Sequence, residues 1–396
     1  MSHYKIPAGG LAWAGLAAMT VSFGLNFSMG VFFAPTAADY GVSATVLAVA
    51  AALGTAVTGV VQPFVGRLLD AVGAKMVLIG GLALISGSYL VLSSVRHTWE
   101  FVAAYMLLGG AGFAASSTLA VTTLIGRALG ERMGPALTRA AVGINLGQLL
   151  GPWAATAMFE PFGVRATYAL FGAAGLAVAA LLWAILPADR VRDPVAGHRE
   201  SLAGRGRVLV SFGLHSATLY VVILMLPKHA IEEGWSVVSA GRLVALAAIA
   251  AGLTSTAMVS LQRRYRPEVL LRGLYLVRIA ALALAIAPLD ALGVVAVLFG
   301  AASFPIVPLT MAILSRGLDP ARMGRTLSPA WVIHQLSAAA GLAVAGLIHF
   351  HTDSYRGYFA LGLAFSVAAA LLLAPEPRTP QRNPGVVNAR IPEPHR

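Results

Sequence analysis

GRLLDAVGAK, residues 66–75, separates two long apolar segments of this chain. The stretch combines Arg67, Asp70 and Lys75 with two glycines. A bilayer core of about 30 Å takes roughly 20 apolar helical residues, and each flanking segment reaches that length. A short charged turn between two such segments is typical of a chain that crosses a membrane repeatedly.

The composition predicts a membrane protein made of helices. Of 396 residues, 58% are hydrophobic and 11% are charged, about half the charge of a soluble globular chain. Apolar segments of spanning length lie near 10–33, 43–65, 76–95, 99–125, 134–158, 166–186, 208–228, 237–261, 269–288, 291–315, 326–349 and 355–374. We therefore predict an all-α membrane protein with twelve transmembrane helices. The first segment is longer than the apolar region of a signal peptide, so we expect it to be retained.

Arginine and lysine are distributed unequally between alternate loops. One set of loops, together with both ends of the chain, holds almost all of them, and the other set holds Arg96, Arg165, Lys228 and Arg356. Because basic residues accumulate on the cytoplasmic side, both termini are predicted to be cytoplasmic. An even number of helices likewise requires both termini to lie on the same side of the membrane. The net charge of +12 then reflects topology, and we expect no nucleic-acid partner.

A polar segment in the middle of the chain indicates two halves. Residues 187–207, PADRVRDPVAGHRESLAGRGR, have six predicted spans before them and six after them. We predict an N-terminal six-helix bundle over 1–186, a cytoplasmic linker over 187–207 and a C-terminal six-helix bundle over 208–374. The proline-rich tail, 375–396, is predicted to be disordered.

The quoted stretch resembles the G-x-L-x-D-x-x-G-x-[RK] signature of the major facilitator superfamily. Gly66, Leu68, Asp70, Gly73 and Lys75 match it, in the expected loop between the second and third helices. The resemblance implies a latch that holds the cytoplasmic side closed, with Asp70 bonded to the start of the eleventh helix and to a nearby arginine. The expected latch residues are Gly66, Arg67, Asp70, Gly73, Lys75 and Arg127.

Three longer stretches, 23–43, 227–241 and 334–359, resemble the bacterial branch related to monocarboxylate transporters and the oxalate:formate antiporter. The resemblance implies a multi-pass carrier of the bacterial inner membrane whose substrate is a small organic anion. Members of that branch carry a substrate-binding arginine in the eighth helix, whereas residues 243–261, LVALAAIAAGLTSTAMVSL, have no charge.

An alternative within the superfamily is a proton-coupled drug antiporter. GQLLGPWAA, 147–155, partly matches its fifth-helix signature through Gly147, Gly151 and Pro152. Small residues at this spacing also let helices pack closely without any role in antiport. All sixteen acidic residues fall in loops, tails or helix ends, so no mid-span carboxylate is available to pair a cationic drug. An exporter of a neutral or amphiphilic compound therefore stays as the second hypothesis.

Two predicted spans contain histidine at mid-depth. His215 lies in the seventh span, and His334 lies in the eleventh, on one face with Trp331 and next to Gln335. Imidazole titrates near neutral pH, so either histidine is a candidate to carry a coupling proton or, when charged, to bind an anion. Hydrogen bonding to a neighbouring helix is the alternative role.

Other polar residues within the spans are weaker candidates. Asn26 in the first helix and Tyr105 in the fourth lie on polar stripes that could border a cavity. Arg242 lies near the outer end of the eighth span, where it is expected to snorkel outward or to attract an anion. Arg278 lies in the ninth helix, which is peripheral in this fold family, so we expect it to snorkel in a structural role.

Enzyme functions find no support, because the P-loop, HExxH and G-x-S-x-G motifs are absent from the sequence. We expect no cofactor and no metal, a monomer, and only a small-molecule substrate, protons and the lipid bilayer as partners. The expected function is a secondary transporter of a monocarboxylate-like anion that works by alternating access, with proton coupling as a hypothesis. The candidate substrate-binding or coupling residues are Asn26, Tyr105, His215, Trp331, His334 and Gln335.

Overall fold

The computed structural model describes residues 8–187, 199–287 and 291–373. The predicted disorder of the tail lies outside the described residues, as does most of the predicted linker. Within the described ranges the regular elements are helices, apart from one isolated bridge between Arg199 and Leu318.

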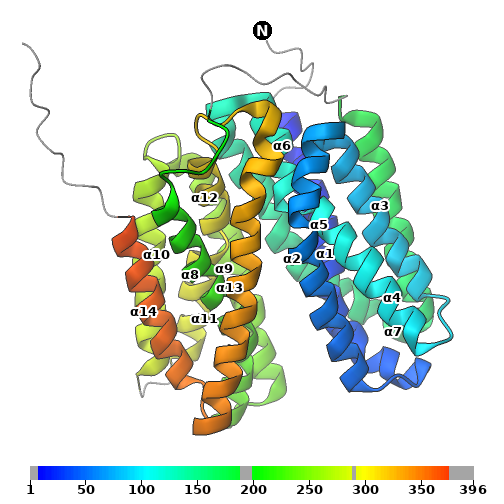
Figure 1. Ribbon diagram of the computed structural model, residues 1–396. Helices are drawn as coiled ribbons and strands as arrows, with labels where there is room; N and C mark the ends of the chain where they lie inside the picture. The colour runs from blue at the N-terminus through cyan, green and yellow to red at the C-terminus, as the bar shows by residue number, and fades with distance from the viewer. Residues whose placement is uncertain (1–7, 188–198, 288–290, 374–396) are drawn as a thin grey trace, which may run out of the picture.

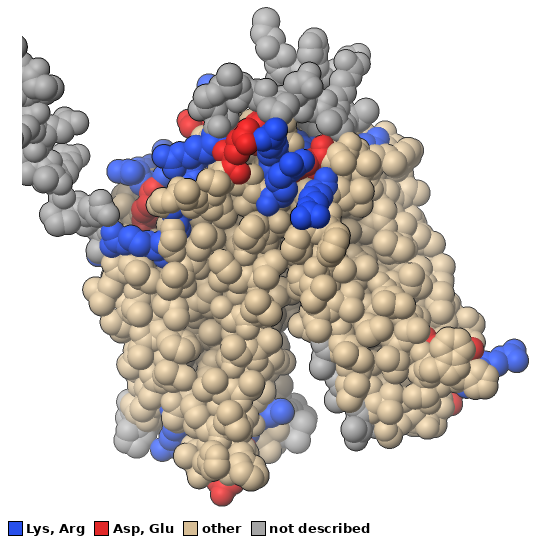
Figure 2. Space-filling view, in the orientation of Figure 1, with Lys and Arg blue, Asp and Glu red and all other residues tan. Residues whose placement is uncertain are grey.

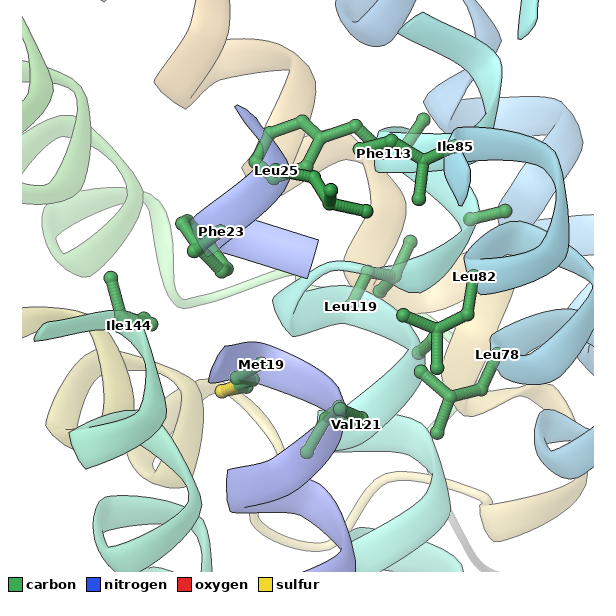
Figure 3. Packing of buried hydrophobic residues seen from close by; sticks show 14 of the residues in the cluster. Met19, Phe23, Leu25, Leu78, Leu82, Ile85, Phe113, Leu119, Val121 and Ile144 are labelled. Carbon is green, nitrogen blue, oxygen red and sulfur yellow. The ribbon is translucent and has the colours of Figure 1, made fainter. Parts of the chain in front are cut away.

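The N-terminal half is folded into one group of helices (Figure 1). Its elements are α1 Ala8–Tyr40, α2 Ala44–Val72, α3 Ala74–Leu92, α4 Thr98–Ala103, the π-helix η1 Ala104–Gly110, α5 Ala111–Ser116, α6 Thr118–Leu129, the 3₁₀ turn η2 Gly130–Arg132 and α7 Met133–Ile185. Buried apolar side chains of α1, α3, α5, α6 and α7, among them Phe23, Leu82 and Phe113, pack together inside this group (Figure 3).

The C-terminal half forms a second group beside the first (Figure 1). Its elements are α8 Gly206–Glu232, α9 Val237–Leu261, α10 Pro267–Ile286, α11 Leu292–Ser303, α12 Ile306–Leu314, the 3₁₀ turn η3 Pro320–Arg322, α13 Met323–Thr352 and α14 Arg356–Leu372. The break between α11 and α12 falls at Pro305, whose ring removes a backbone donor.

Nine segments of the described chain are long and apolar enough to cross a membrane. One of them, Thr98–Ile185, has 88 residues and contains three membrane-length stretches, separated by η2 and by Gly163. Gly163 has φ 74° and ψ 169°, which lie outside the helical region, so α7 turns there. With the 17-residue α14 added, the described helices give twelve passes. The predicted all-α fold of twelve transmembrane helices in two six-helix bundles is confirmed.

The predicted end of the second helix is wrong. We expected a span over 43–65 and a turn over 66–75, but α2 continues to Val72, and only Gly73 separates it from α3. Gly73 has φ 94°, which a glycine adopts without strain. Asp70 therefore lies on the last turn of a helix, where its side chain has a fixed direction.

The two groups of helices touch at one end and separate at the other. We call the first the basic end, because Lys and Arg gather on its surface (Figure 2). Hydrogen bonds place Arg127, Arg205, Arg316 and Arg325 at this end. Here α2 packs on α13, and α7 packs on α9 through a hydrogen bond from Gln262 Nε2 to Thr138 Oγ1 of 2.5 Å. At the opposite end the surface is hollowed between the two groups (Figure 2).

Within the N-terminal group, α1 and α7 pack almost backbone to backbone. A Cβ on Gly147 would lie 2.5 Å from Thr20 O and 2.6 Å from Gly24 N. A Cβ on Gly151 would lie 2.6 Å from Gly24 O. These distances are shorter than van der Waals contact, so the glycines are needed for the close approach of the two helices.

We predict that Gly147→Ala destabilises the protein by roughly 1–3 kcal/mol, since the added methyl must push two backbones apart. Gly30→Ala on α1 is the matched control, because a Cβ there meets nothing within 4 Å. Helix propensity alone favours alanine by up to about 1 kcal/mol at both positions. Thermal unfolding of the two variants in detergent measures the difference, and equal melting temperatures would contradict the close packing.

Candidate functional site

Asp70 is the centre of a buried network at the basic end. Its Oδ1 accepts hydrogen bonds from Arg127 Nη2 and Gly324 N, each at 2.9 Å. Its Oδ2 accepts from Arg325 N at 2.9 Å and Arg325 Nε at 3.0 Å. Gly324 and Arg325 belong to the first turn of α13, whose backbone donors have no partner inside the helix. The carboxylate of α2 thus caps α13 and meets the positive end of its dipole.

Arg127, at the end of α6, ties three elements together. Besides Asp70 it donates to Leu69 O at 2.9 Å, Pro320 O at 2.8 Å and Ala321 O at 3.2 Å. Both members of the Arg127–Asp70 ion pair are at most 5% exposed. A buried pair is stable only when its remaining hydrogen-bonding capacity is used, and here the carbonyls and amides use it.

The closeness of α2 and α13 depends on two glycines. A Cβ on Gly66 would lie 2.7 Å from Gly324 O, and a Cβ on Gly324 would lie 2.5 Å from Gly66 O. The other predicted latch residues lie outside this network. Arg67 is exposed over the Phe64 ring, and Lys75 donates to Leu186 O at 2.5 Å, at the end of α7.

We predict that Asp70→Asn loosens the basic end. The amide loses the charge that strengthens several hydrogen bonds, each contributing roughly 1.5–3 kcal/mol. The chain has no cysteine, so Ser328→Cys gives a single thiol on α13 facing Gly66. We expect maleimide to label this buried thiol at least about tenfold faster in the Asp70→Asn background.

Arg67→Gln is the matched control for that measurement. It also removes one charge from α2, but its side chain lies outside the network, so labelling of the Ser328→Cys thiol should not change. If both backgrounds label alike, Asp70 does not hold this end closed.

The second polar assembly lies inside the C-terminal group, on α8 and α10. His215 Nδ1 and Arg278 Nη1 are 2.6 Å apart, and Arg278 Nη2 donates to His215 O at 3.1 Å. The guanidinium carbon is 4.5 Å from the centre of the Phe299 ring. Arg278 is fully buried, and no carboxylate of the described chain lies within 4.0 Å of it.

The prediction that Arg278 snorkels is therefore wrong. Its helix lies at the edge of the fold, but the side chain points inward against α8 rather than along the helix toward the lipid surface. Arg242, in contrast, is exposed on α9.

His215 and His334 belong to one aromatic cluster, which we call the histidine cluster: Phe212, His215, Tyr220, Trp331 and His334. The two imidazole ring centres are 6.0 Å apart. The His334 ring centre lies 4.6 Å from that of Phe212, 5.1 Å from that of Trp331 and 5.9 Å from that of Tyr220. Ser216 Oγ fixes α13 to α8 by donating to His334 O at 2.6 Å. The two predicted histidines and Trp331 are thus brought together.

Several buried polar atoms near the contact between the two groups have no hydrogen-bond partner within the described chain. They are Gln62 Oε1, Asn145 Oδ1, Gln148 Oε1, His215 Nε2, Trp331 Nε1 and His334 Nε2. A buried polar atom without a partner costs roughly 1–3 kcal/mol. Such atoms are therefore usually matched by a ligand or by water.

A cavity of about 230 Å³ lies between the two groups, and Tyr220 is the member of the histidine cluster that lines it. Phe27, Gln148 and Pro152 line it from α1 and α7, while Tyr220 and Phe304 line it from the C-terminal group. Its volume is below the 300–1,000 Å³ typical of sites for drug-sized ligands. A larger groove of about 510 Å³ between α1 and α7 is lined by apolar residues, glycines and one threonine, with no ionisable side chain.

The remaining predicted site residues lie elsewhere or at the edge. Asn26 and Tyr105 line a separate small cavity inside the N-terminal group, so they do not join the histidines. Gln335 is beside His334, with its Oε1 at 3.4 Å from His334 Nδ1. In the described chain no three His, Asp or Glu side chains gather into a metal site.

The sequence did not single out Arg325 or Tyr220. Arg325 binds Asp70 mainly through its position in the first turn of α13, and a Gly-Arg pair at a helix start was the available signal. Tyr220 faces the cavity because α8 turns that side of the helix toward α7, which depends on how the helices pack.

The comparisons with known proteins agree with this architecture of two helix bundles around a central cavity. The profile of the Major Facilitator Superfamily matches residues 15–331. The chain belongs to the Major Facilitator Superfamily, whose characterised members are membrane transporters.

Individual relatives are more distant. The chain is 24% identical over 375 residues to the "Uncharacterized MFS-type transporter YcxA" of Bacillus subtilis (strain 168), covering 87% of this chain and 89% of that protein. It is 29% identical over 257 residues to human "Monocarboxylate transporter 11", covering 61% of this chain and 54% of that protein. Among solved structures, the human organic anion transporter MFSD10 superposes with a TM-score of 0.73 at 18% identity, covering 93% of this chain and 100% of that one.

Proposed function

We propose that this protein is a secondary active transporter of a small organic anion, of the monocarboxylate type, in the bacterial inner membrane. The observation that carries the proposal is a fully buried Arg278 that has no carboxylate partner in the described chain and lies behind His215. A buried cation without a counter-charge is costly, and an anionic ligand in the neighbouring cavity would lower that cost.

The hydrogen-bonding groups of the site also suit an anion. Trp331 Nε1 is a donor only, and His215 and His334 each keep one ring nitrogen unpartnered. A carboxylate is an acceptor only, so it complements two or three such donors. The names of two similar proteins, a monocarboxylate transporter and an organic anion transporter, support the same substrate class.

Transport would proceed by alternating access around this cavity. The basic end is proposed to be cytoplasmic, as the distribution of Lys and Arg predicts, with both termini on that side. The hollow at the opposite end would then face outward, while the Asp70 network keeps the cytoplasmic end closed. Rocking of the two bundles would break that network and open the cytoplasmic side.

Coupling to protons is proposed to run through His334. A proton bound at its free Nε2 would give the site a second positive charge and a further donor for the carboxylate. Release of the proton on the less acidic side would weaken the hold on the anion. The cavity would then favour uptake of anion and proton together.

The second candidate function is export of a neutral or amphiphilic compound. The observation that favours it is the largely apolar wall of the central cavity, with Phe27, Leu219, Ile223 and Phe304 among its lining residues. Such a ligand would need no cation, so its binding would not depend on His334.

We predict that monocarboxylates raise the melting temperature of the purified protein, more strongly at about pH 5.5 than at about pH 7.5. At a ligand concentration of about 100 times Kd the gain is roughly 2.7 kcal/mol. His334→Ala should lose the pH dependence and most of the gain.

His351→Ala is the matched control, because this histidine is exposed at the end of α13, far along the helix from the cavity. It should respond as the unmodified protein does. Stabilisation by neutral amphiphiles but not by carboxylates, unchanged in His334→Ala, would favour the exporter instead.

A further inference from the structure

The chemistry of the two side chains defines the donor and the acceptor in the contact between Arg278 and His215. A guanidinium has only donors, and it stays charged in proteins. The 2.6 Å contact between Arg278 Nη1 and His215 Nδ1 therefore requires a lone pair on Nδ1. A neutral imidazole with Nδ1 free carries its proton on Nε2.

We infer that Arg278 is a positioning residue that holds His215 as the neutral Nε2–H tautomer, so that His215 presents a fixed hydrogen-bond donor to the substrate's carboxylate. The substrate part of this inference rests on the proposed transport of an organic anion. The tautomer part stands on the geometry alone.

Three contacts hold Arg278 in place for this role. Its Nη2 donates to the backbone oxygen of the same His215, which fixes the guanidinium relative to α8. The Phe299 ring of α11 lies at 4.5 Å over the guanidinium carbon, which is favourable for a cation. Both side chains are at most 1% exposed, so bulk solvent does not reach the contact at His215 Nδ1.

The ionisable neighbours of the pair do not reverse this assignment. They are Tyr275 on α10, Tyr358 on α14 and His334 on α13. Tyr275 exchanges hydrogen bonds with Ser211, and Tyr358 donates to Ala217 O at 2.6 Å, so both hydroxyls are already used. Neither α9, α11 nor α12 directs a carboxylate at the pair within the described chain. A proton on His215 Nδ1 would point at a guanidinium and is excluded.

The two histidines consequently have different capacities. His215 Nδ1 is occupied by a cation, so this imidazole does not take up a second proton. His334 Nδ1 faces an amide at 3.4 Å, which can present either oxygen or nitrogen, and its Nε2 is free. His215 is thus a constant donor, and of the two only His334 can change its charge during the transport cycle.

Nuclear magnetic resonance of the full-length protein with isotope-labelled histidine tests the tautomer directly. The chain has nine histidines, and the His215 signals are identified by their absence from the His215→Gln variant. In the unmodified protein we expect the Nε2–H pattern to stay constant between about pH 5 and 8. A His215 signal that titrates in this range, or that shows the Nδ1–H pattern, would overturn the inference.

Variants of the arginine give a second, independent reading. In Arg278→Met the His215 signals should begin to titrate, whereas Arg278→Lys should keep them constant because an ammonium also donates to Nδ1. Constant signals in a folded Arg278→Met protein would show that Arg278 does not fix the tautomer. Should Arg278→Met fail to fold, the spectra of the unmodified and Arg278→Lys proteins still show whether His215 stays in the Nε2–H tautomer.

Uptake of a labelled monocarboxylate tests the substrate part. His215→Gln keeps an amide donor near the position of Nε2, so its KM should stay within about twofold, while His215→Leu should raise KM at least about tenfold. Equal KM values for the two variants would refute the donor role. If the spectra agree with the inference but no carboxylate is taken up, the proposed function fails and the positioning role of Arg278 stands.

Discussion

One buried carboxylate joins the two groups of helices at the end where they touch. Asp70 accepts four hydrogen bonds from Arg127, Gly324 and Arg325, and these donors come from both groups of helices. A carboxylate removed from water is stable only while such donors surround it. Separation of α2 from α13 would leave Asp70 and Arg127 without part of their partners unless water enters. The charge therefore favours two states, fully closed or fully hydrated, over a partly open one.

The rest of the architecture follows from rigid contacts within each group. Glycines let α1 and α7 approach within backbone contact, and Gly300 lets α11 approach α9 in the same way. Helices packed so closely do not slide past one another easily. We therefore expect motion to occur at the surface between the groups, where buried apolar side chains of both groups meet and the Asp70 network adds polar contacts. Contact at the basic end accompanies separation at the other end, where the hollow lies (Figure 2).

The sequence predicted the fold well because apolar segment length and charge distribution are local properties. It also predicted the Asp70–Arg127 contact, since the signature places Asp70 and the resemblance to the superfamily places Arg127 at the same end of the fold. The sequence did not predict the features that depend on how the helices pack against one another. The last turn of α2 carries charge and is still helical because α13 covers it. The spacing of apolar residues in 66–72 does not indicate this contact. The direction of Arg278 depends on the rotation of α10 against α8, so a residue expected at the lipid surface is instead buried against His215. Asn26 and Tyr105 were separated from the histidines for the same reason.

In the proposed mechanism, the charge of Arg278 would link substrate binding to the movement of the bundles. Dipoles surround this guanidinium, namely an imidazole nitrogen, a backbone carbonyl and an aromatic ring, and none of them carries a full negative charge. On this proposal, Arg278 would give the cavity a positive potential, and aqueous ions or water would offset that potential whenever the cavity is open without substrate. Closing the cavity without an anion would remove the ions and water that offset the charge. Closing it with a bound anion would leave the charge neutralised. The same buried cation that would attract the substrate would thus also oppose closure of the empty carrier, which is the condition a secondary transporter needs to couple movement to cargo.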